Sequence, residues 1–127
     1  REVFVRKSCQ QCHGDRRALG PDLSGVARRF SREDLLTAIA DPNRDVSPRY
    51  QTTLIVTAQG HTHTGIVIYE SIDGLLLRDS QGQTIRIEAD QIDVRRQLSE
   101  SLMPTGLLSD LAPTELADLF AYLQTID

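Results

Sequence analysis

The stretch Cys9-Gln10-Gln11-Cys12-His13 decides how the rest of the chain is understood. Two cysteines separated by two residues and followed at once by a histidine form the attachment signature of c-type haem. Each cysteine sulfur can form a thioether with a vinyl-derived carbon of the porphyrin, and the adjacent imidazole then reaches the iron from one side. The motif therefore predicts one covalently attached haem c, with Cys9 and Cys12 as thioether residues and His13 as an axial ligand.

The composition leaves room for such a cofactor. The chain has 127 residues, of which 39% are hydrophobic and only 5% aromatic. This length fits one domain with a modest insertion, and a large apolar cofactor would complete a core that is poor in aromatic side chains. The net charge of −4 does not indicate nucleic-acid binding, which needs a concentrated basic face.

The hydropathy of the chain and its first residues bear on membrane spans and on targeting signals. No apolar run approaches the roughly 18–20 residues that span a bilayer, so no membrane span is expected in this segment. The chain begins at Arg1-Glu2-Val3-Phe4, inside an expected helix and without a signal peptide. We therefore expect a mature or excised domain whose upstream residues are missing.

The cysteine pair could also serve in a thioredoxin-type redox site, a zinc site or a disulfide. A thioredoxin-type pair follows a strand and opens a helix of a βαβ unit, whereas this pair follows the short helical stretch Val3-Phe4-Val5. Zinc would need two further good ligands, and the only remaining histidines, His61 and His63, lie far along the chain. A disulfide and a chance match are the remaining alternatives.

The residues after the motif suggest a partner for His13. Gly14 to Gly20 is expected to be a short polar loop, followed by irregular backbone from Gly20 to Val26. A haem-ligating histidine needs a hydrogen-bond partner for its other ring nitrogen. The spacing suits the carbonyl of Pro21, since proline has no N–H that could compete. An ordinary turn is the alternative.

Helical patterns flank the motif and return at the end of the chain. Residues 1–12 are predicted to be the end of a helix that leads into the motif. Ser31-Arg32-Glu33-Asp34 resembles a capping box, and Asp41-Pro42 ends the helix that it starts. A last helix is predicted from Pro113, although Ala112 is a poor residue for its N-cap.

Between these helices the hydrophobic period changes to that of strands. Five β-rich segments are separated by Gly-containing turn signals, which predicts a small antiparallel barrel or a strongly curved sheet. The segments are Thr53–Thr57, Gly65–Tyr69, Leu75–Leu77, Thr84–Ile87 and Ile92–Val94. Arginines alternate with acids in this region, which is typical of a solvated mixed face.

The motifs together resemble a class I cytochrome c. The resemblance rests on C-x-x-C-H, on Gly20-Pro21-Asp22-Leu23, and on Met103-Pro104 before an amphipathic C-terminal helix. The longer run from Gly20 to Phe30, with Asp41-Pro42 and the stretch from Ser47 to Thr52, is similar to a narrower family. This is the haem-binding domain of Planctomycetes and Verrucomicrobia, found at the C-terminus of large proteins described as membrane-bound dehydrogenases.

The resemblance covers nearly the whole chain and implies an α+β fold. Residues 1–127 would form a single domain with the helical fold of a class I cytochrome c. A small antiparallel β-barrel, SH3- or Sm-like, would be inserted at residues 50–97, between the middle helix and the methionine loop. The barrel would serve as a lid over one haem edge or as a docking surface for a partner.

The resemblance also implies the second axial ligand. Met103 is the single methionine of the chain, in a loop with Pro104 and Gly106. In the resembling proteins the methionine of this Met-Pro pair is the distal ligand of the iron. His61 or His63 is the rival ligand. On a strand the two histidines would project to the same side and could bind Cu or Zn if further ligands were present, and exposed hairpin histidines are the alternative.

The function that follows is single-electron transfer by a His/Met-ligated, low-spin mono-haem domain outside the cytoplasmic membrane, rather than catalysis. The expected partners are redox proteins: a dehydrogenase domain of the same parent chain as donor, and a downstream acceptor. Arg28, Arg29, Arg49 and Tyr50 are candidates for contacts with the haem propionates, and solvated arginines with a core tyrosine are the alternative. A haem-based sensor or peroxidase-like protein with a labile distal ligand, and a docking module with structural haem, are the rival functions.

Overall fold

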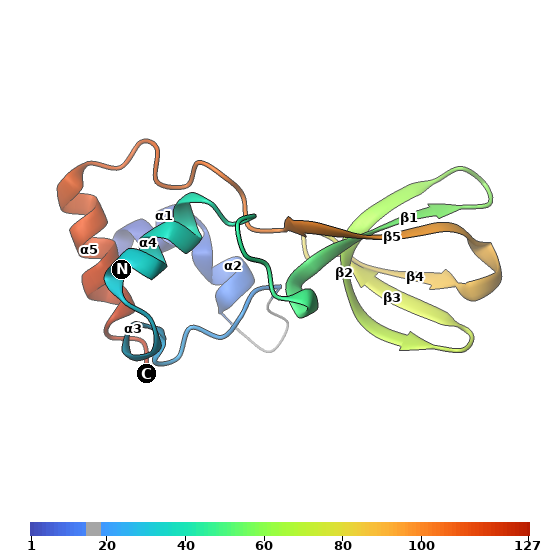
Figure 1. The fold of residues 1–127 in the computed structure, drawn as a ribbon, viewed down its shortest axis with the longest axis horizontal. Coiled ribbons are helices and arrows are strands. Elements are labelled where there is room, and N and C mark those ends of the chain that lie inside the picture. The colour runs from blue at the N-terminus through green and yellow to red at the C-terminus, as the bar shows by residue number, and fades with distance from the viewer. Residues whose placement is uncertain (15–18) are drawn as a thin grey trace. The chain divides into compact units, whose positions relative to one another are not determined.

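The computed structural model describes residues 1–14 and 19–127; residues 15–18 of the expected Gly14–Gly20 loop lie outside the described residues. The described chain divides into two compact units (Figure 1). Residues 1–45 and 103–127 form the helical unit, and residues 46–102 form the β unit. The predicted mixture of helices with an antiparallel sheet is therefore confirmed.

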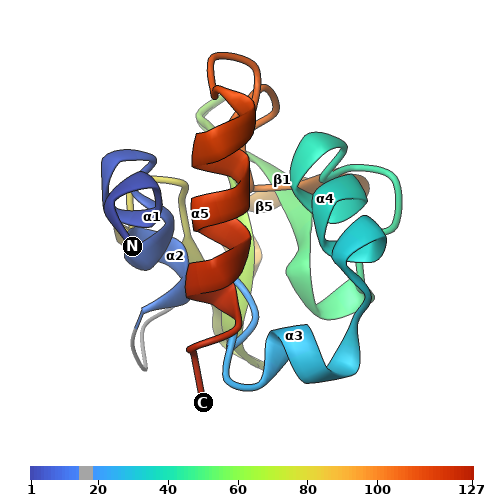
Figure 2. The same ribbon diagram turned by 90° about the vertical axis from the view of Figure 1, so that its left-hand side faces the viewer.

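In its described residues, the helical unit contains five short helices (Figure 2). They are α1 (Glu2–Arg6), α2 (Cys9–His13), α3 (Val26–Arg29), α4 (Arg32–Ala40) and α5 (Pro113–Leu123). The expectation of one helix through residue 12 was wrong, because the backbone of Ser8 adopts a left-handed conformation with φ of 58° and separates α1 from α2. The N–H of Ser8 donates to the carbonyl of Val5 and closes α1.

Helix α4 begins as its sequence predicts. Ser31 Oγ accepts the backbone N–H of Asp34 at 3.1 Å, and the carboxylate of Asp34 accepts the N–H of Ser31 at 3.2 Å. This reciprocal capping box confirms the predicted start. The helix ends at Ala40, just before Asp41-Pro42.

Helix α5 also begins at the predicted Pro113, although Ala112 has no side-chain acceptor. Glu115 makes up half of the missing cap, because its Oε2 accepts the N–H of Ala112 at 2.9 Å. The apolar side of α5 packs into a core with α1, α3 and α4, and the rings of Phe4 and Tyr122 lie 5.1 Å apart. The buried members of this core are Val3, Phe4, Val26, Leu35, Leu119, Phe120 and Leu123.

The β unit is a five-stranded antiparallel sheet with the order β4-β3-β2-β1-β5. Its strands are β1 (Gln51–Thr57), β2 (Thr62–Ser71), β3 (Gly74–Arg78), β4 (Thr84–Glu88) and β5 (Ile92–Ser101). Short 3₁₀ turns, η1 (Pro48–Tyr50) and η2 (Ala89–Gln91), precede β1 and β5. All five predicted strands are confirmed, and β2 and β5 are longer than their apolar stretches.

The sheet bends along β2. His63, Ile55 and Arg95 pair in one row across β2, β1 and β5. Glu70 lies further along β2, and an extended strand would carry it about 23 Å from that row. Its Oε2 nevertheless accepts from Arg95 Nη2 at 3.1 Å, so β2 must curve back toward β5. A register shift between Val67 and Tyr69 provides a local bend.

The β unit has its own hydrophobic core. Ile55, Leu75, Leu77 and Ile87 are buried together, from β1, β3 and β4. The chain enters and leaves the sheet at one place, because Gln51 at the start of β1 pairs with Ser101 at the end of β5. Within residues 1–14 and 19–127, no helix combines the length and the apolar character that crossing a membrane requires.

Candidate functional site

Helix α2 carries the whole C-x-x-C-H motif. Cys9 and Cys12 lie three residues apart on this helix, so their side chains project from the same face. Both thiols are free and half-buried, and Cys9 packs against the core of the helical unit. Burial raises the pKa of both thiols, which keeps them protonated at neutral pH. The two sulfurs are thus available to one ligand on one side of α2.

The hydrogen bond expected for His13 is present. His13 Nδ1 lies 2.8 Å from the carbonyl oxygen of Pro21. Because a carbonyl can only accept, Nδ1 carries a proton, and in the neutral imidazole the lone pair is then on the other ring nitrogen, Nε2. The backbone beside this contact is tied to α2, since Gly20 N–H donates to the Cys12 carbonyl at 2.9 Å. His13 is therefore held in the tautomer that a metal ligand needs.

Gly20 forms the surface against which the imidazole lies. A Cβ at this position would stand 2.5 Å from His13 Cε1 and 2.8 Å from Nδ1. Non-bonded atoms do not approach a Cβ so closely, so a larger residue at position 20 would have to displace the ring. The chain before Pro21 thus fits the side chain of His13 closely, a contact that the motif spacing did not predict.

The loop after Pro21 is stabilised by hydrogen bonds of its own. Asp22 Oδ1 accepts from the N–H of Ser24 at 2.9 Å and from its hydroxyl at 2.7 Å. Arg29 Nη2 donates to the carbonyls of Asp22 and Ser24, at 3.2 and 3.0 Å. Arg29 therefore helps to fix the loop that contains the acceptor of His13.

The other candidates for propionate contacts have varied surroundings. Arg28 forms an ion pair with Asp127 at 2.8 Å, on the exposed surface of the helical unit. Arg49 and Tyr50 belong to the β unit, where the guanidinium carbon of Arg49 lies 5.7 Å from the centre of the Tyr50 ring. Contact of these arginines, of Arg29 and of Tyr50 with propionates stays a prediction.

Met103 is the first residue of the second segment of the helical unit, in the same unit as His13. Its side chain is half-buried. The loop turns at Gly106, whose φ of 75° favours glycine, and the carbonyl of Gly106 accepts from Ser109 Oγ at 2.7 Å. The role of Met103 as an axial ligand stays a prediction.

The two remaining histidines do not lie together on one strand. His61 is exposed and precedes β2, where its carbonyl accepts the N–H of Thr57 at 2.8 Å. His63 is half-buried within β2 and pairs with Ile55. Both belong to the β unit, whereas His13 belongs to the helical unit.

In the part of the chain that the structure describes, no group of three or more His, Cys, Asp or Glu side chains is arranged to hold a metal ion. A haem c site would not need such a group, because its two cysteine sulfurs would bind the porphyrin and not the iron. No protein-family model matches the chain, and no curated protein sequence matches it either.

Proposed function

We propose that this chain is a mono-haem c-type cytochrome domain that carries single electrons. The observation that carries the proposal is the surroundings of His13. The Nδ1–H of His13 donates to the Pro21 carbonyl at 2.8 Å. His13 lies on α2, the helix that also presents two free thiols on one face. Structural and catalytic metal sites commonly orient a ligating histidine through such a hydrogen bond.

The residues fit the proposed cofactor. Cys9 and Cys12 would hold it covalently, and His13 Nε2 would bind one axial position of the iron. Gly20 leaves no room beside the ring for a side chain, so the imidazole keeps its orientation. The zinc alternative lacks comparable support, because no further His, Cys, Asp or Glu joins the pair among the described residues.

Met103 would be the second ligand of the iron. Haem c held by an imidazole and a thioether supplies a one-electron Fe(II)/Fe(III) couple. The soft sulfur of Met103 would favour the reduced ion, and with both His13 and Met103 as ligands the iron would not bind substrate or O₂. The proposed activity is thus electron transfer rather than catalysis, and the resemblance to dehydrogenase-linked domains suggests a donor in the same parent protein, outside the cytoplasmic membrane.

The β unit supports the narrower resemblance, because it is inserted in the sequence between α4 and Met103, as in that family. Its strand order and the bend of β2 are compatible with a small SH3-like barrel. We propose the class I cytochrome c arrangement for the helical unit on the packing of Phe4 in α1 against Tyr122 in α5.

Covalent attachment is tested by expressing the full chain with bacterial haem-attachment machinery. The visible haem absorption should remain with the polypeptide after denaturation, and it should be lost in Cys9→Ala/Cys12→Ala. Gln10→Ala/Gln11→Ala is the matched control, since both glutamines lie exposed on α2. A parent protein without covalent haem would end the proposal.

The second ligand is tested with Met103→Leu, which keeps the apolar volume and removes the sulfur. We expect the weak charge-transfer band of methionine-bound Fe(III) to disappear, whereas Thr105→Ala, an exposed change in the same loop, should retain it. A band that survives Met103→Leu, or one that is absent from the parent, would favour the sensor or peroxidase-like alternative with an open distal side.

A further inference from the structure

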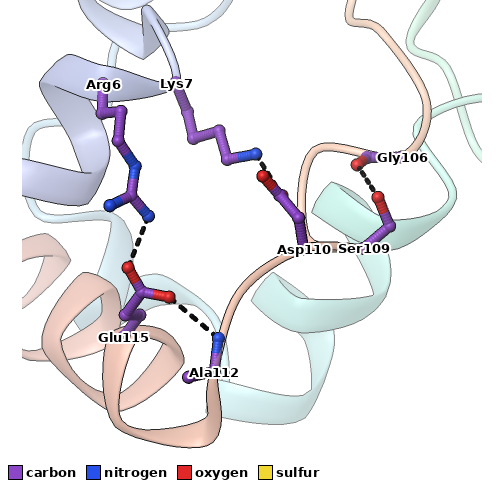
Figure 3. A network of polar contacts seen from close by, with 7 residues as sticks. All are labelled: Arg6, Lys7, Gly106, Ser109, Asp110, Ala112 and Glu115. Atoms are coloured by element: carbon purple, nitrogen blue, oxygen red, sulfur yellow. Dashed lines mark hydrogen bonds and ion pairs between the residues drawn. The ribbon is translucent and has the colours of Figure 1, made fainter.

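Two neighbouring basic residues at the end of α1 bind different parts of the C-terminal segment (Figure 3). Arg6 Nη2 lies 2.5 Å from Oε1 of Glu115, in the first turn of α5. Lys7 Nζ forms an ion pair with Asp110, in the loop that precedes α5. Adjacent residues thus bind one helix and one loop.

The Arg6–Glu115 pair joins elements that are already packed together. Helices α1 and α5 share the buried core of the helical unit, and Phe4 contacts Tyr122 across it. The side chain of Arg6 is 47% exposed, so water and salt screen its charge. Loss of this pair should leave the two helices in place.

The Lys7–Asp110 pair holds a segment without regular structure. Residues 102–112 lie between β5 and α5, and Met103 stands at the beginning of this loop. Leu108 and Leu111 pack against the core, and the N–H of Ser109 donates to the Gly106 carbonyl at 3.2 Å. This turn shortens the path from Asp110 back to Met103, so a restraint at Asp110 limits the movement of the methionine.

The environment of Lys7 suits such a restraint. The side chain of Lys7 is 18% exposed and that of Asp110 is 68% exposed, so the ammonium approaches an accessible loop carboxylate from a largely covered position. The hydrogen bond from Lys7 lowers the pKa of Asp110, which is therefore ionised at neutral pH. Lys7 is also followed closely by Cys9, on the opposite side of the left-handed Ser8.

We propose that Lys7 and Asp110 are positioning residues, whose ion pair ties the Met103 loop to the segment leading into Cys9 and limits how readily the thioether leaves the iron. This inference rests on the proposed function. A thioether is a neutral, weak ligand, and its release requires the loop to open. An external ligand that binds only the open state gains apparent affinity when opening becomes easier.

The experiment compares Lys7→Gln and Asp110→Asn with Arg6→Gln in the haem-loaded full chain. Lys7→Gln and Arg6→Gln each remove one positive charge at adjacent positions, so they are matched in net charge. Imidazole is titrated into the oxidised protein and its displacement of methionine is followed by loss of the charge-transfer band. We expect roughly two- to fivefold tighter imidazole binding in Lys7→Gln and Asp110→Asn, and no change in Arg6→Gln.

Amide hydrogen exchange supplies a readout that does not depend on haem. In the unloaded full chain, Lys7→Gln should speed exchange at residues 105–110 relative to both the parent and Arg6→Gln. The charge-swapped pair Lys7→Glu/Asp110→Lys should restore the parental exchange and imidazole affinity. Restoration supports a direct ion pair and excludes a general loss of stability.

The outcomes separate this inference from the proposed function. A chain that takes up no covalent haem overturns the proposed function, and the exchange measurement then still decides whether Lys7 restrains the loop. A loaded protein in which Lys7→Gln and Arg6→Gln behave alike overturns the positioning role and leaves the cytochrome proposal intact.

Discussion

Gly20 lies directly against the imidazole of His13, where a Cβ would stand 2.5 Å from Cε1. Gly20→Ala should therefore displace the ring, break its hydrogen bond to the Pro21 carbonyl and destabilise the fold by roughly 1–3 kcal/mol. The measurements are the unfolding free energy from urea titration and the yield and spectrum of covalent haem.

Gly60→Ala is the matched control for this prediction. Gly60 has a φ of 84° and nothing within 4 Å of an added Cβ, so the substitution should cost about 1–2 kcal/mol of backbone strain and leave the haem spectrum unchanged. An unaltered spectrum in Gly20→Ala would contradict the role given to Gly20.

At this scale the sequence predicted the contacts that depend on short spacing. The carbonyl of Pro21 could be named as the partner of His13 because only eight positions separate the two residues. The contacts of Gly20 with the ring, and of Arg29 with the Asp22 carbonyl, were not predicted because they depend on the path of the loop. A glycine directly before Pro21 was the one local signal. The Lys7–Asp110 pair, which joins residues 103 positions apart, had none.

At the scale of single elements, the N-termini of α4 and α5 differ in whether the N-cap side chain can accept a hydrogen bond. Ser31 Oγ accepts the N–H of Asp34 at the start of α4, whereas Ala112 has no acceptor for α5. The backbone of Ala112 already has the extended conformation of an N-cap, with φ of −68° and ψ of 156°. Ala112→Ser should therefore stabilise the protein by about 0.5–1 kcal/mol, measured by urea unfolding.

The reverse change at α4 is the control. Ser31→Ala should destabilise the protein by about 1 kcal/mol, because the N–H of Asp34 loses its acceptor. If Ser31→Ala has this effect and Ala112→Ser has none, a serine at position 112 does not accept the backbone N–H of Glu115 as Ser31 accepts that of Asp34.

The elements themselves followed from periodicity more fully than their ends did. The apolar repeat and Pro113 predicted α5, and short β-rich runs separated by Gly-containing turn signals predicted all five strands. The part of β5 from Arg95 to Ser101 is mostly polar and largely exposed. It has no apolar pattern of its own, and its pairing with β1 makes it a strand. The break at Ser8 was missed because serine has no strong preference for the left-handed conformation that it adopts there.

At the scale of the whole molecule, the two units have separate hydrophobic cores. Residues 46–102 should therefore fold without the rest of the chain. The excised segment should give a β-type circular dichroism spectrum and a cooperative urea transition, since its buried leucines and isoleucines come from its own strands. Leu77→Ala, which removes a fully buried side chain, should abolish that transition. A disordered excised segment would show that the β unit depends on the helical unit.

The pH dependence follows from carboxylates that accept hydrogen bonds. The Ser31 hydroxyl lowers the pKa of Asp34, and the N–H of Ala112, with Arg6, lowers the pKa of Glu115. Because the folded-state pKa lies below the unfolded one, the stabilisation is fully present above about pH 5 and is lost as the pH falls through the folded values. Urea midpoints should fall between about pH 5 and pH 3.

Asp34→Asn isolates one of these groups. The variant should be less stable than the parent at about pH 7, and the difference should shrink as the pH falls through the lowered pKa of Asp34, because protonation removes its charge. An equal difference at both pH values would mean that Asp34 acts through its shape rather than through its charge.

The pairing of Gln51 with Ser101 has a consequence for the order of folding. Helices α1 and α5 are separated in the chain by the whole β unit. While that unit is unfolded, contact between the two helices closes a long loop, which costs conformational entropy. Once β1 and β5 have paired, the ends of the insertion are adjacent, and the effective loop between α1 and α5 becomes roughly twofold shorter, which saves about 0.6 kcal/mol of closure entropy. Early folding of the β unit would thus accelerate the docking of α5, and mutations that slow its strand pairing should slow the helical unit as well.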